Sequence, residues 1–181
     1  MKQIDKTNIS DEAPDVLFMR QAIEQAEMAA CIGEVPIGAV VVCDGAIIAS
    51  AYNRREIDAD PSAHAEFRAL IEASEKLGRW RLSGCTVYIT LEPCLMCAGL
   101  MQQARIDRCV YGASDPKAGA LGSLFSINDD KRLNHNFEVT AGVCRQECSS
   151  LLSGFFEGLR TSNRAESRTE NSDKISENGD T

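Results

Sequence analysis

The chain has 181 residues, of which 44% are hydrophobic and 25% charged, values typical of one globular domain that can bury a sizeable core. No apolar stretch approaches the roughly 20 residues that a membrane span needs, so the sequence predicts no membrane segment. The formal net charge of −8 argues against a nucleic-acid partner unless basic residues gather locally.

The 8 cysteines are irregularly spaced along the chain. The N-terminus has no basic flank followed by an apolar run, so the sequence predicts no signal peptide. Irregular spacing without an export signal favours free thiols in a reducing compartment over a disulfide framework. We therefore expect a cytoplasmic protein.

Composition divides the chain into three parts. Residues 1–15 are largely polar and patternless, so we expect a flexible N-terminal segment. Residues 16–160 have the periodic apolar pattern of one folded domain. Residues 161–181 are rich in serine, asparagine and charged residues and contain no aromatic one, which predicts a disordered polar C-terminal tail.

Apolar periodicity and glycine or proline breaks predict alternating helices and strands within the domain. Pro14-Asp15 marks a helix start, and a helical period of apolar residues runs from Val16 to about Ile32, where Gly33 ends it. A continuous β-branched run then predicts a buried strand, and Asp44-Gly45 predicts a tight turn into the next one. In chain order the expected elements are a helix over 16–32, strands over 37–43 and 46–51, a helix from Pro61 to Gly78, a strand over 85–91, a helix over 93–104, a strand over 106–111, a short helical piece near 121–127, a strand over 137–143 and a helix over 144–160.

The connections between these elements predict the fold class. The tight turn makes the first two strands antiparallel, whereas the strand–helix–strand unit over 85–111 predicts a parallel crossover. The sequence therefore predicts a three-layer α/β/α domain on a five-stranded mixed sheet. In such a domain the ligand site lies at strand ends and helix N-termini.

Two short motifs predict a catalytic zinc site. A catalytic zinc takes three protein ligands and leaves a fourth position for water. Cys94 and Cys97 are three residues apart, so on a helix they share one face, and His64 supplies a third ligand. Pro93 suits the first turn of that helix, whose N-terminus favours thiolates. We expect one Zn²⁺ per chain, with Glu66 close to the metal as a proton shuttle.

Other interpretations of the cysteine pair remain. A lone C-x-x-C also occurs as a redox pair or as half of a structural zinc site. The sequence has no second C-x-x-C, and Cys144 and Cys148 are the nearest substitute. The combination of His-x-Glu with a later Pro-Cys-x-x-Cys is the signature of zinc deaminases, in which an activated hydroxide displaces an amino group from a base.

Longer segments resemble the bacterial tRNA-specific adenosine deaminase family. The resemblance spans most of residues 16–160, and the segments that show it are Gly33–Val40, Thr90–Gly99, Asp115–Ala120 and Leu133–His135. It implies the cytidine-deaminase-like fold, a homodimer, and hydrolytic deamination of adenosine to inosine at the wobble position of a tRNA anticodon. The anticodon loop would bind near both chains.

The resemblance also implies roles for two residues outside the zinc motifs. It places Asn53 in contact with the substrate and Asp115 on the nucleic-acid side of the site. From the residues alone, Asn53 suits either a base edge or an ordinary loop, and Asp115-Pro116 suits an ordinary turn.

Two other functions are consistent with the zinc motifs. One is a deaminase of a free base or nucleoside, such as cytosine, guanine or cytidine. The other is a non-catalytic, zinc-stabilised RNA-binding domain, which Glu66 disfavours because a binding module needs no acid–base carboxylate. If RNA is bound, the candidates for a local basic surface are Arg54-Arg55, Arg79, Arg81, Lys117 and Lys131-Arg132.

Overall fold

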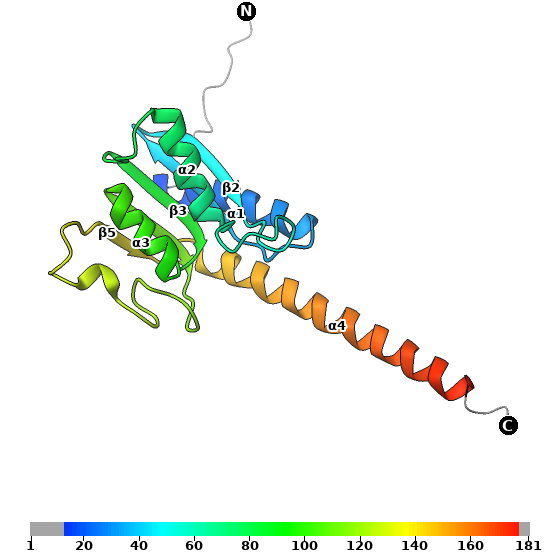
Figure 1. Cartoon of the computed structure of the whole chain (residues 1–181). Helices are drawn as coiled ribbons and strands as arrows, with labels where there is room; N and C mark the ends of the chain where they lie inside the picture. Colours follow the sequence, from blue (N-terminus) through cyan, green and yellow to red (C-terminus); the bar gives the residue numbers. More distant parts are fainter. Residues whose placement is uncertain (1–12, 178–181) are drawn as a thin grey trace, which may run out of the picture.

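A five-stranded mixed sheet forms the middle layer of the protein (Figure 1). The computed structural model describes residues 13–177, with side chains up to residue 162. The strand order is β2-β1-β3-β4-β5; β1 is antiparallel to both of its neighbours, and β3, β4 and β5 are parallel. The strands are β1 (Gly38–Cys43), β2 (Ala46–Tyr52), β3 (Cys85–Leu91), β4 (Arg108–Ala113) and β5 (Glu138–Ala141).

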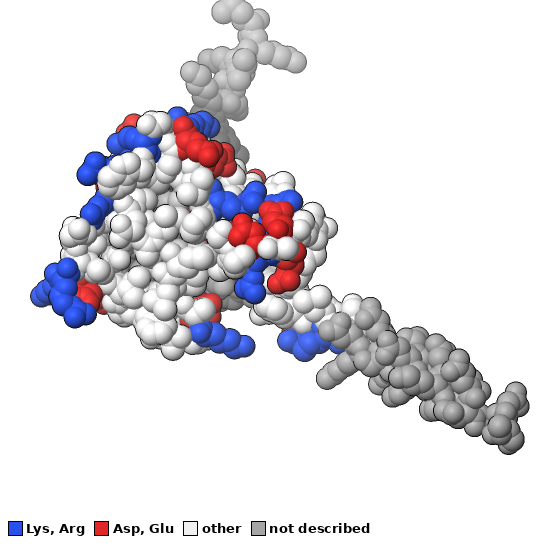
Figure 2. Space-filling view, viewed as in Figure 1, with Lys and Arg blue, Asp and Glu red and all other residues white. Residues whose placement is uncertain are grey.

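Helices cover both faces of this sheet, which confirms the predicted three-layer architecture. They are α1 (Pro14–Cys31), α2 (Ala65–Leu77), α3 (Leu95–Ala104) and α4 (Arg145–Glu177), with a short 3₁₀ helix η1 (Ile127–Asp129). The α2 and α3 helices share one buried cluster with the sheet, whereas α1 and α4 share the other. Figure 2 shows a largely uncharged surface over α3 and the adjoining side of α2, with charged residues at its edges.

Alternating side chains of β3 supply both core layers. Ile89 packs in the cluster that contains Leu70 of α2, whereas Tyr88 packs in the cluster that contains Met19 of α1. Successive residues of a strand point to opposite faces, so the central strand β3 is buried on both sides.

The topology brings several chain segments to one edge of the sheet. Because β1 is antiparallel to both β2 and β3, the strands β2, β3 and β4 run in the same direction and end at the same edge. The loops that follow them, and the starts of α2 and α3, therefore meet there. This edge is where an open α/β sheet binds its ligands.

The start of α1 lies earlier than the predicted domain boundary. Residues 1–12 are outside the described part of the chain, but Pro14 and Asp15 already belong to α1. The Asp15 carboxylate accepts hydrogen bonds from Arg108 of β4 (Nη2–Oδ2, 2.7 Å) and from the Tyr88 hydroxyl (2.8 Å). Asp15 is therefore a fixed part of the domain and not of a flexible segment.

The C-terminal helix is longer than the sequence predicted. We expected an end near Arg160 and a disordered tail from Thr161, whereas α4 continues to Glu177 and runs away from the sheet (Figure 1). Polar composition predicted disorder, but no proline or glycine between 159 and 177 interrupts the helix. No helix in the described residues, α4 included, is long and apolar enough to cross a membrane.

Gly38 sets how closely α1 approaches the sheet, which leads to a stability prediction. A Cβ at this position would overlap the backbone of Ala22 and Ala26 in α1. We expect Gly38→Ala to lower the free energy of unfolding by about 1–3 kcal/mol, the usual cost of overpacking. Urea denaturation measures this change. Gly154→Ala in α4 is the control, because its added Cβ meets no atom beyond the adjacent backbone of its own helix. Stability should be unchanged or slightly raised. Equal unfolding curves for the two variants would contradict the prediction.

Candidate metal centre

Four side chains from the starts of α2 and α3 meet at this edge of the sheet. The metal-binding atoms of His64, Glu66, Cys94 and Cys97 all lie within 4.8 Å of one another. The Nδ1 atom of His64 is 3.7 Å from the sulfur of Cys94 and 3.7 Å from that of Cys97. The structure thus assembles the group that the two sequence motifs predicted.

The distances within this group fit a zinc ion. A tetrahedral zinc with a Zn–N bond of about 2.05 Å and a Zn–S bond of about 2.3 Å holds the nitrogen and the sulfur about 3.6 Å apart. The observed separations of 3.7 Å agree with that value. Two sulfurs and one imidazole nitrogen form a three-ligand set that leaves a fourth position for water, as catalytic zinc sites do.

His64 occupies the N-cap position of α2 instead of its first turn. We expected the helix to begin at Pro61-Ser62, but it begins at Ala65, and His64 has an extended backbone (φ −72°, ψ 148°). The Asp60 carboxylate accepts hydrogen bonds from the Ser62 amide (2.8 Å) and hydroxyl (2.7 Å), which closes a turn in place of a helix. The turn places the imidazole just before the helix axis starts.

Cys94 occupies the same position on α3. The predicted helix begins at Pro93, whereas the observed one begins at Leu95 with Cys94 as its N-cap (φ −75°, ψ 174°). Pro93 instead accepts a backbone hydrogen bond from Ala120 (2.8 Å). Cys97 lies in the first turn and is completely buried. Both cysteines are therefore near the positive end of the helix dipole.

The two thiols cannot both ionise easily on their own. The Cys97 thiol, by hydrogen bonding to the Cys94 sulfur, lowers the pKa of Cys94 to about 4. The same contact, together with burial, raises the pKa of Cys97 well above its ordinary value. A dication between the sulfurs removes the repulsion between two thiolates, so this donor set suits a metal such as zinc.

Glu66 combines burial with closeness to the candidate ligands. Its side chain is 4% exposed and follows His64 by two residues in the first turn of α2. Burial raises the pKa of Glu66 above its ordinary value, although the nearby His64 opposes that effect. A carboxyl group in such an environment takes up a proton more readily than an exposed glutamate does.

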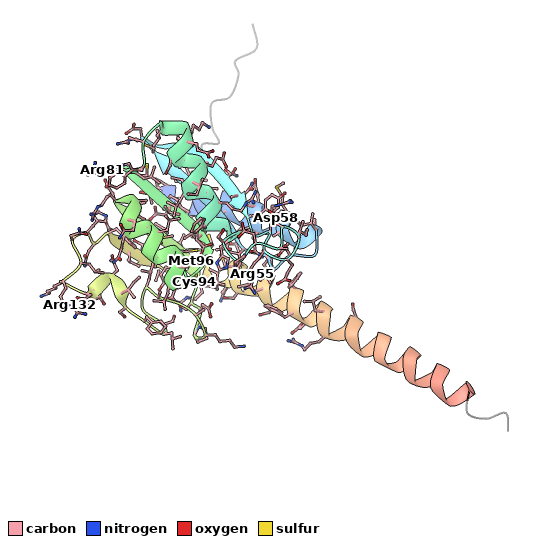
Figure 3. All side chains as sticks on the ribbon, viewed as in Figure 1. Arg55, Asp58, Arg81, Cys94, Met96 and Arg132 are labelled. Carbon is pink, nitrogen blue, oxygen red and sulfur yellow. The ribbon has the colours of Figure 1, made fainter. Side chains whose placement is uncertain are left out.

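A pocket of about 320 Å³ opens over this group. Five of the six predicted site residues line it, namely Asn53, His64, Glu66, Cys94 and Asp115, while Cys97 lies buried beneath. Arg55 also lines the pocket, and Figure 3 shows it next to Cys94. A larger hollow lies between β2 and α2, but none of the six residues lines it.

Asn53 and Asp115 reach the pocket from the ends of β2 and β4. The side chain of Asn53 is only 5% exposed. The Asp115 carboxylate accepts hydrogen bonds from the amides of Lys117 (2.9 Å) and Ala118 (3.2 Å), so it closes the turn that forms one wall. Asp115 therefore has the turn geometry of an Asp-Pro sequence and also lines the pocket.

Two buried carboxylates that line the pocket were not predicted from the sequence. Glu34 is 1% exposed and accepts hydrogen bonds from the Asn53 side-chain amide (2.9 Å) and from the Ile57 backbone (2.8 Å). Glu92, 2% exposed, directly precedes the Pro93-Cys94 pair. For Glu34, the available signal was a charged residue between a helix-ending glycine and a buried strand. For Glu92, it was a charged residue at the end of a buried strand.

Comparison with known proteins agrees with this site. Residues 15–160 match the model of the MafB19-like deaminase family. Together with the α/β/α fold and the two-sulfur, one-nitrogen donor set, this match defines a zinc-dependent deaminase with the cytidine-deaminase-like fold.

Individual relatives define the family more narrowly. The tRNA-specific adenosine deaminase of Bacillus subtilis is 48% identical over 151 residues, which cover 83% of this chain and 94% of the relative. That of Haemophilus influenzae is 46% identical over 84% of this chain and 88% of the relative. A solved structure from a study of A-to-I editing by tRNA:A34 deaminases matches with a TM-score of 0.73 and 43% identity, covering 75% of this chain and 99% of the other. This chain belongs to the tRNA-specific adenosine deaminase family.

The geometry of the site predicts the effect of single substitutions on bound metal. We expect Cys94→Ala to lower bound zinc from about one ion per chain to less than about a tenth of that, because two remaining donors hold zinc poorly. Glu66→Gln is the matched control and should retain the ion. Atomic absorption after exhaustive dialysis measures both. If Glu66→Gln loses zinc as Cys94→Ala does, Glu66 is a ligand.

Proposed function

We propose that this protein hydrolytically deaminates adenosine to inosine at the wobble position of a tRNA anticodon. The observation that supports this most directly is the buried His64–Glu66–Cys94–Cys97 group at the floor of a pocket. The chain around that group is 48% identical to a tRNA-specific adenosine deaminase. A free-base deaminase with the same zinc chemistry is the second candidate, and the pocket alone suits both.

The residues of the site divide between metal binding and proton transfer. We assign His64, Cys94 and Cys97 as the ligands of one zinc ion, which when bound lowers the pKa of a coordinated water toward 7 and supplies hydroxide. The Glu66 carboxylate takes a proton from the attacking water, passes it to the purine ring nitrogen, and later delivers one to the departing ammonia. Its buried position keeps this proton away from bulk solvent.

One of the hydrogen-bonding groups of the Asn53 side chain is already used within the protein, which limits those that can contact the substrate. Its side-chain NH₂ donates one hydrogen bond to Glu34. The second N–H and the Oδ1 atom are the groups with which it contacts the base edge. Because Glu34 is buried and also holds the Ile57 amide, the Asn53 side chain is fixed before substrate arrives. We propose that Asp115, on the pocket wall formed by the 115–118 turn, faces the RNA.

The shape of the pocket requires a base that leaves its stack. An unpaired nucleotide in an anticodon loop can turn into the pocket at low cost, whereas a paired one cannot. A second groove of about 390 Å³ adjoins the pocket through the 115–118 turn and lies between that turn and α4. Lys117, Arg160 and the 43% exposed Phe156 line it, together with one carboxylate, Glu157. The two basic side chains suit phosphates, and the exposed ring suits a stacked base.

Several other basic residues are engaged by neighbouring groups. Arg54 forms an ion pair with Asp58 (2.8 Å), and Arg132 forms one with Asp130 (2.6 Å). Such pairs reduce the positive charge that these side chains offer to RNA. The groove between the 115–118 turn and α4 is therefore our choice for the local basic surface that an acidic protein needs to bind tRNA.

We also propose a homodimer that forms through the surface over α2 and α3, called here the apolar face. Its exposed apolar residues are Ile71, Trp80, Leu95 and Met96. Figure 3 places Met96 near the middle of this face and Arg81 and Arg132 toward its edges. Met101, also on α3, is completely buried and belongs to the core. Since Cys94 adjoins the apolar face, a second copy would lie close to the pocket and to the bound anticodon loop.

The state of the cysteines supports a cytoplasmic location. All 8 cysteines lie in the described part of the chain, and none of them forms a disulfide. The site needs two of them reduced to hold zinc. A reducing compartment that contains tRNA meets both conditions.

Substrate choice decides between the two candidate functions. Purified protein should form inosine in tRNA and should leave free cytosine, guanine and cytidine unchanged, as nucleoside analysis after incubation will show. Glu66→Gln should reduce inosine formation by roughly 10²–10⁴-fold while it still binds tRNA, because only proton transfer is lost. Turnover of a free base or nucleoside, without turnover of tRNA, would support the second candidate instead.

The dimer proposal has a separate test. Light scattering at micromolar concentration should give twice the chain mass for the natural protein. Met96→Glu should shift the protein toward monomer, because a charge in an apolar interface is costly to bury. Leu17→Glu is the control, since Leu17 is 43% exposed on α1, on the opposite side of the sheet. A monomeric natural protein would rule the dimer out.

A further inference from the structure

The buried carboxylate of Glu92 accepts hydrogen bonds from three residues of a single loop. Its Oε1 atom accepts from the backbone N–H groups of Leu121 (3.1 Å) and Ser123 (3.0 Å). Its Oε2 atom accepts from the N–H of Asp115 (3.1 Å) and from the Ser123 hydroxyl. Hydrogen bonds to an ionised acceptor are the stronger ones, so this side chain organises residues 115–123 from within.

The same loop is joined to the metal centre. The Ala120 amide donates to the Pro93 carbonyl (2.8 Å), and Gly119 pairs with Cys94 as an isolated antiparallel bridge. A Cβ at Gly119 would overlap the Glu92 carboxylate, so only a glycine allows this close approach. Through the loop, Glu92 supports the backbone at Pro93 and Cys94.

The loop is also a wall of the substrate pocket, because Asp115 and Ala118 line it. We propose that Glu92 is a positioning residue that, through residues 115–123, holds both this pocket wall and the backbone of Cys94. Glu92 itself also lines the pocket, but both of its oxygens accept hydrogen bonds from the loop, so it acts through the loop and not on the substrate. The part that concerns the pocket wall rests on the proposed function, whereas the part that concerns Cys94 does not.

Glu92→Gln separates these two effects. The amide oxygen of glutamine can still accept from Leu121 and Ser123, but its NH₂ group then faces the Asp115 amide, donor against donor. If the glutamine amide turned the other way, its NH₂ group would face the N–H groups of Leu121 and Ser123. That arrangement opposes two backbone donors and is the less favourable one. The substitution therefore releases the turn at Asp115 and keeps the other half of the loop in place.

Kinetics and metal affinity of the full-length zinc enzyme test the proposal. Glu92→Gln should raise KM for tRNA about tenfold, with kcat within about threefold of the natural value and zinc affinity unchanged. Glu92→Ala removes the hydrogen bonds to Asp115 and also those to Leu121 and Ser123. It should therefore also weaken zinc binding about tenfold in competition with a chelator.

Asp15→Asn provides a control in which another carboxylate network, partly buried and far from the pocket, is lost. Asp15 bonds to Arg108 at the start of β4, at the opposite end of that strand from the pocket. The control should lower the melting temperature without changing KM or zinc affinity. A lower melting temperature as the only effect of both Glu92 variants would show that the residue merely stabilises the fold, and would overturn the proposal.

Gly119→Ala is a second test that leaves Glu92 in place. The added Cβ pushes the loop away from the carboxylate, so KM should rise and zinc affinity should fall as in Glu92→Ala. If Glu92→Ala does not fold, Gly119→Ala decides the question. A Gly119→Ala variant whose zinc affinity and KM equal those of the natural enzyme would overturn the proposal. If the natural enzyme makes no inosine in tRNA, the proposed function fails, and the chelator comparison still decides the part that concerns Cys94.

Discussion

Two thiols and one imidazole lie in contact at the edge of this sheet, although the charges on two thiolates repel. The directions of the strands bring these groups to helix N-termini, where thiolates are favoured. Since β2 and β3 run the same way, the helices that follow them both start at this edge, and their N-caps are His64 and Cys94. The partial positive charge of a helix N-terminus favours a thiolate there. A bound dication supplies the remainder of the compensation.

The arrangement of the rest of the site follows from the same edge. Asn53 follows β2, Glu92 follows β3, and Asp115 lies two residues after the end of β4. None of these residues is in a regular element, yet each is held by hydrogen bonds that a buried carboxylate or a turn provides. Irregular backbone at a binding site is thus kept in one conformation without strands or helices.

The parts of the site that were predictable from sequence are those that depend on local spacing. Cys94 and Cys97 are one helical turn apart, and His64 and Glu66 belong to one short motif, so neighbouring residues alone indicate the chemistry. Glu34 and Glu92 were not predictable, because their partners lie 19 to 31 residues away and become neighbours only in the folded sheet. The start of α2 was misplaced because the chain from Asp60 to Ser62 forms a local turn and His64 keeps an extended backbone, so the helix begins only at Ala65.

The division of the candidate ligands between α2 and α3 has a thermodynamic consequence. His64 and the two cysteines are separated by a whole helix and a strand, so an unfolded chain offers zinc no comparable set of donors. An ion that binds only the folded chain stabilises it by about 1.4 kcal/mol for each tenfold excess of free zinc over its dissociation constant. Typical domains have a total stability of only about 5–15 kcal/mol, so the cellular supply of zinc would help to determine how much of this enzyme is folded.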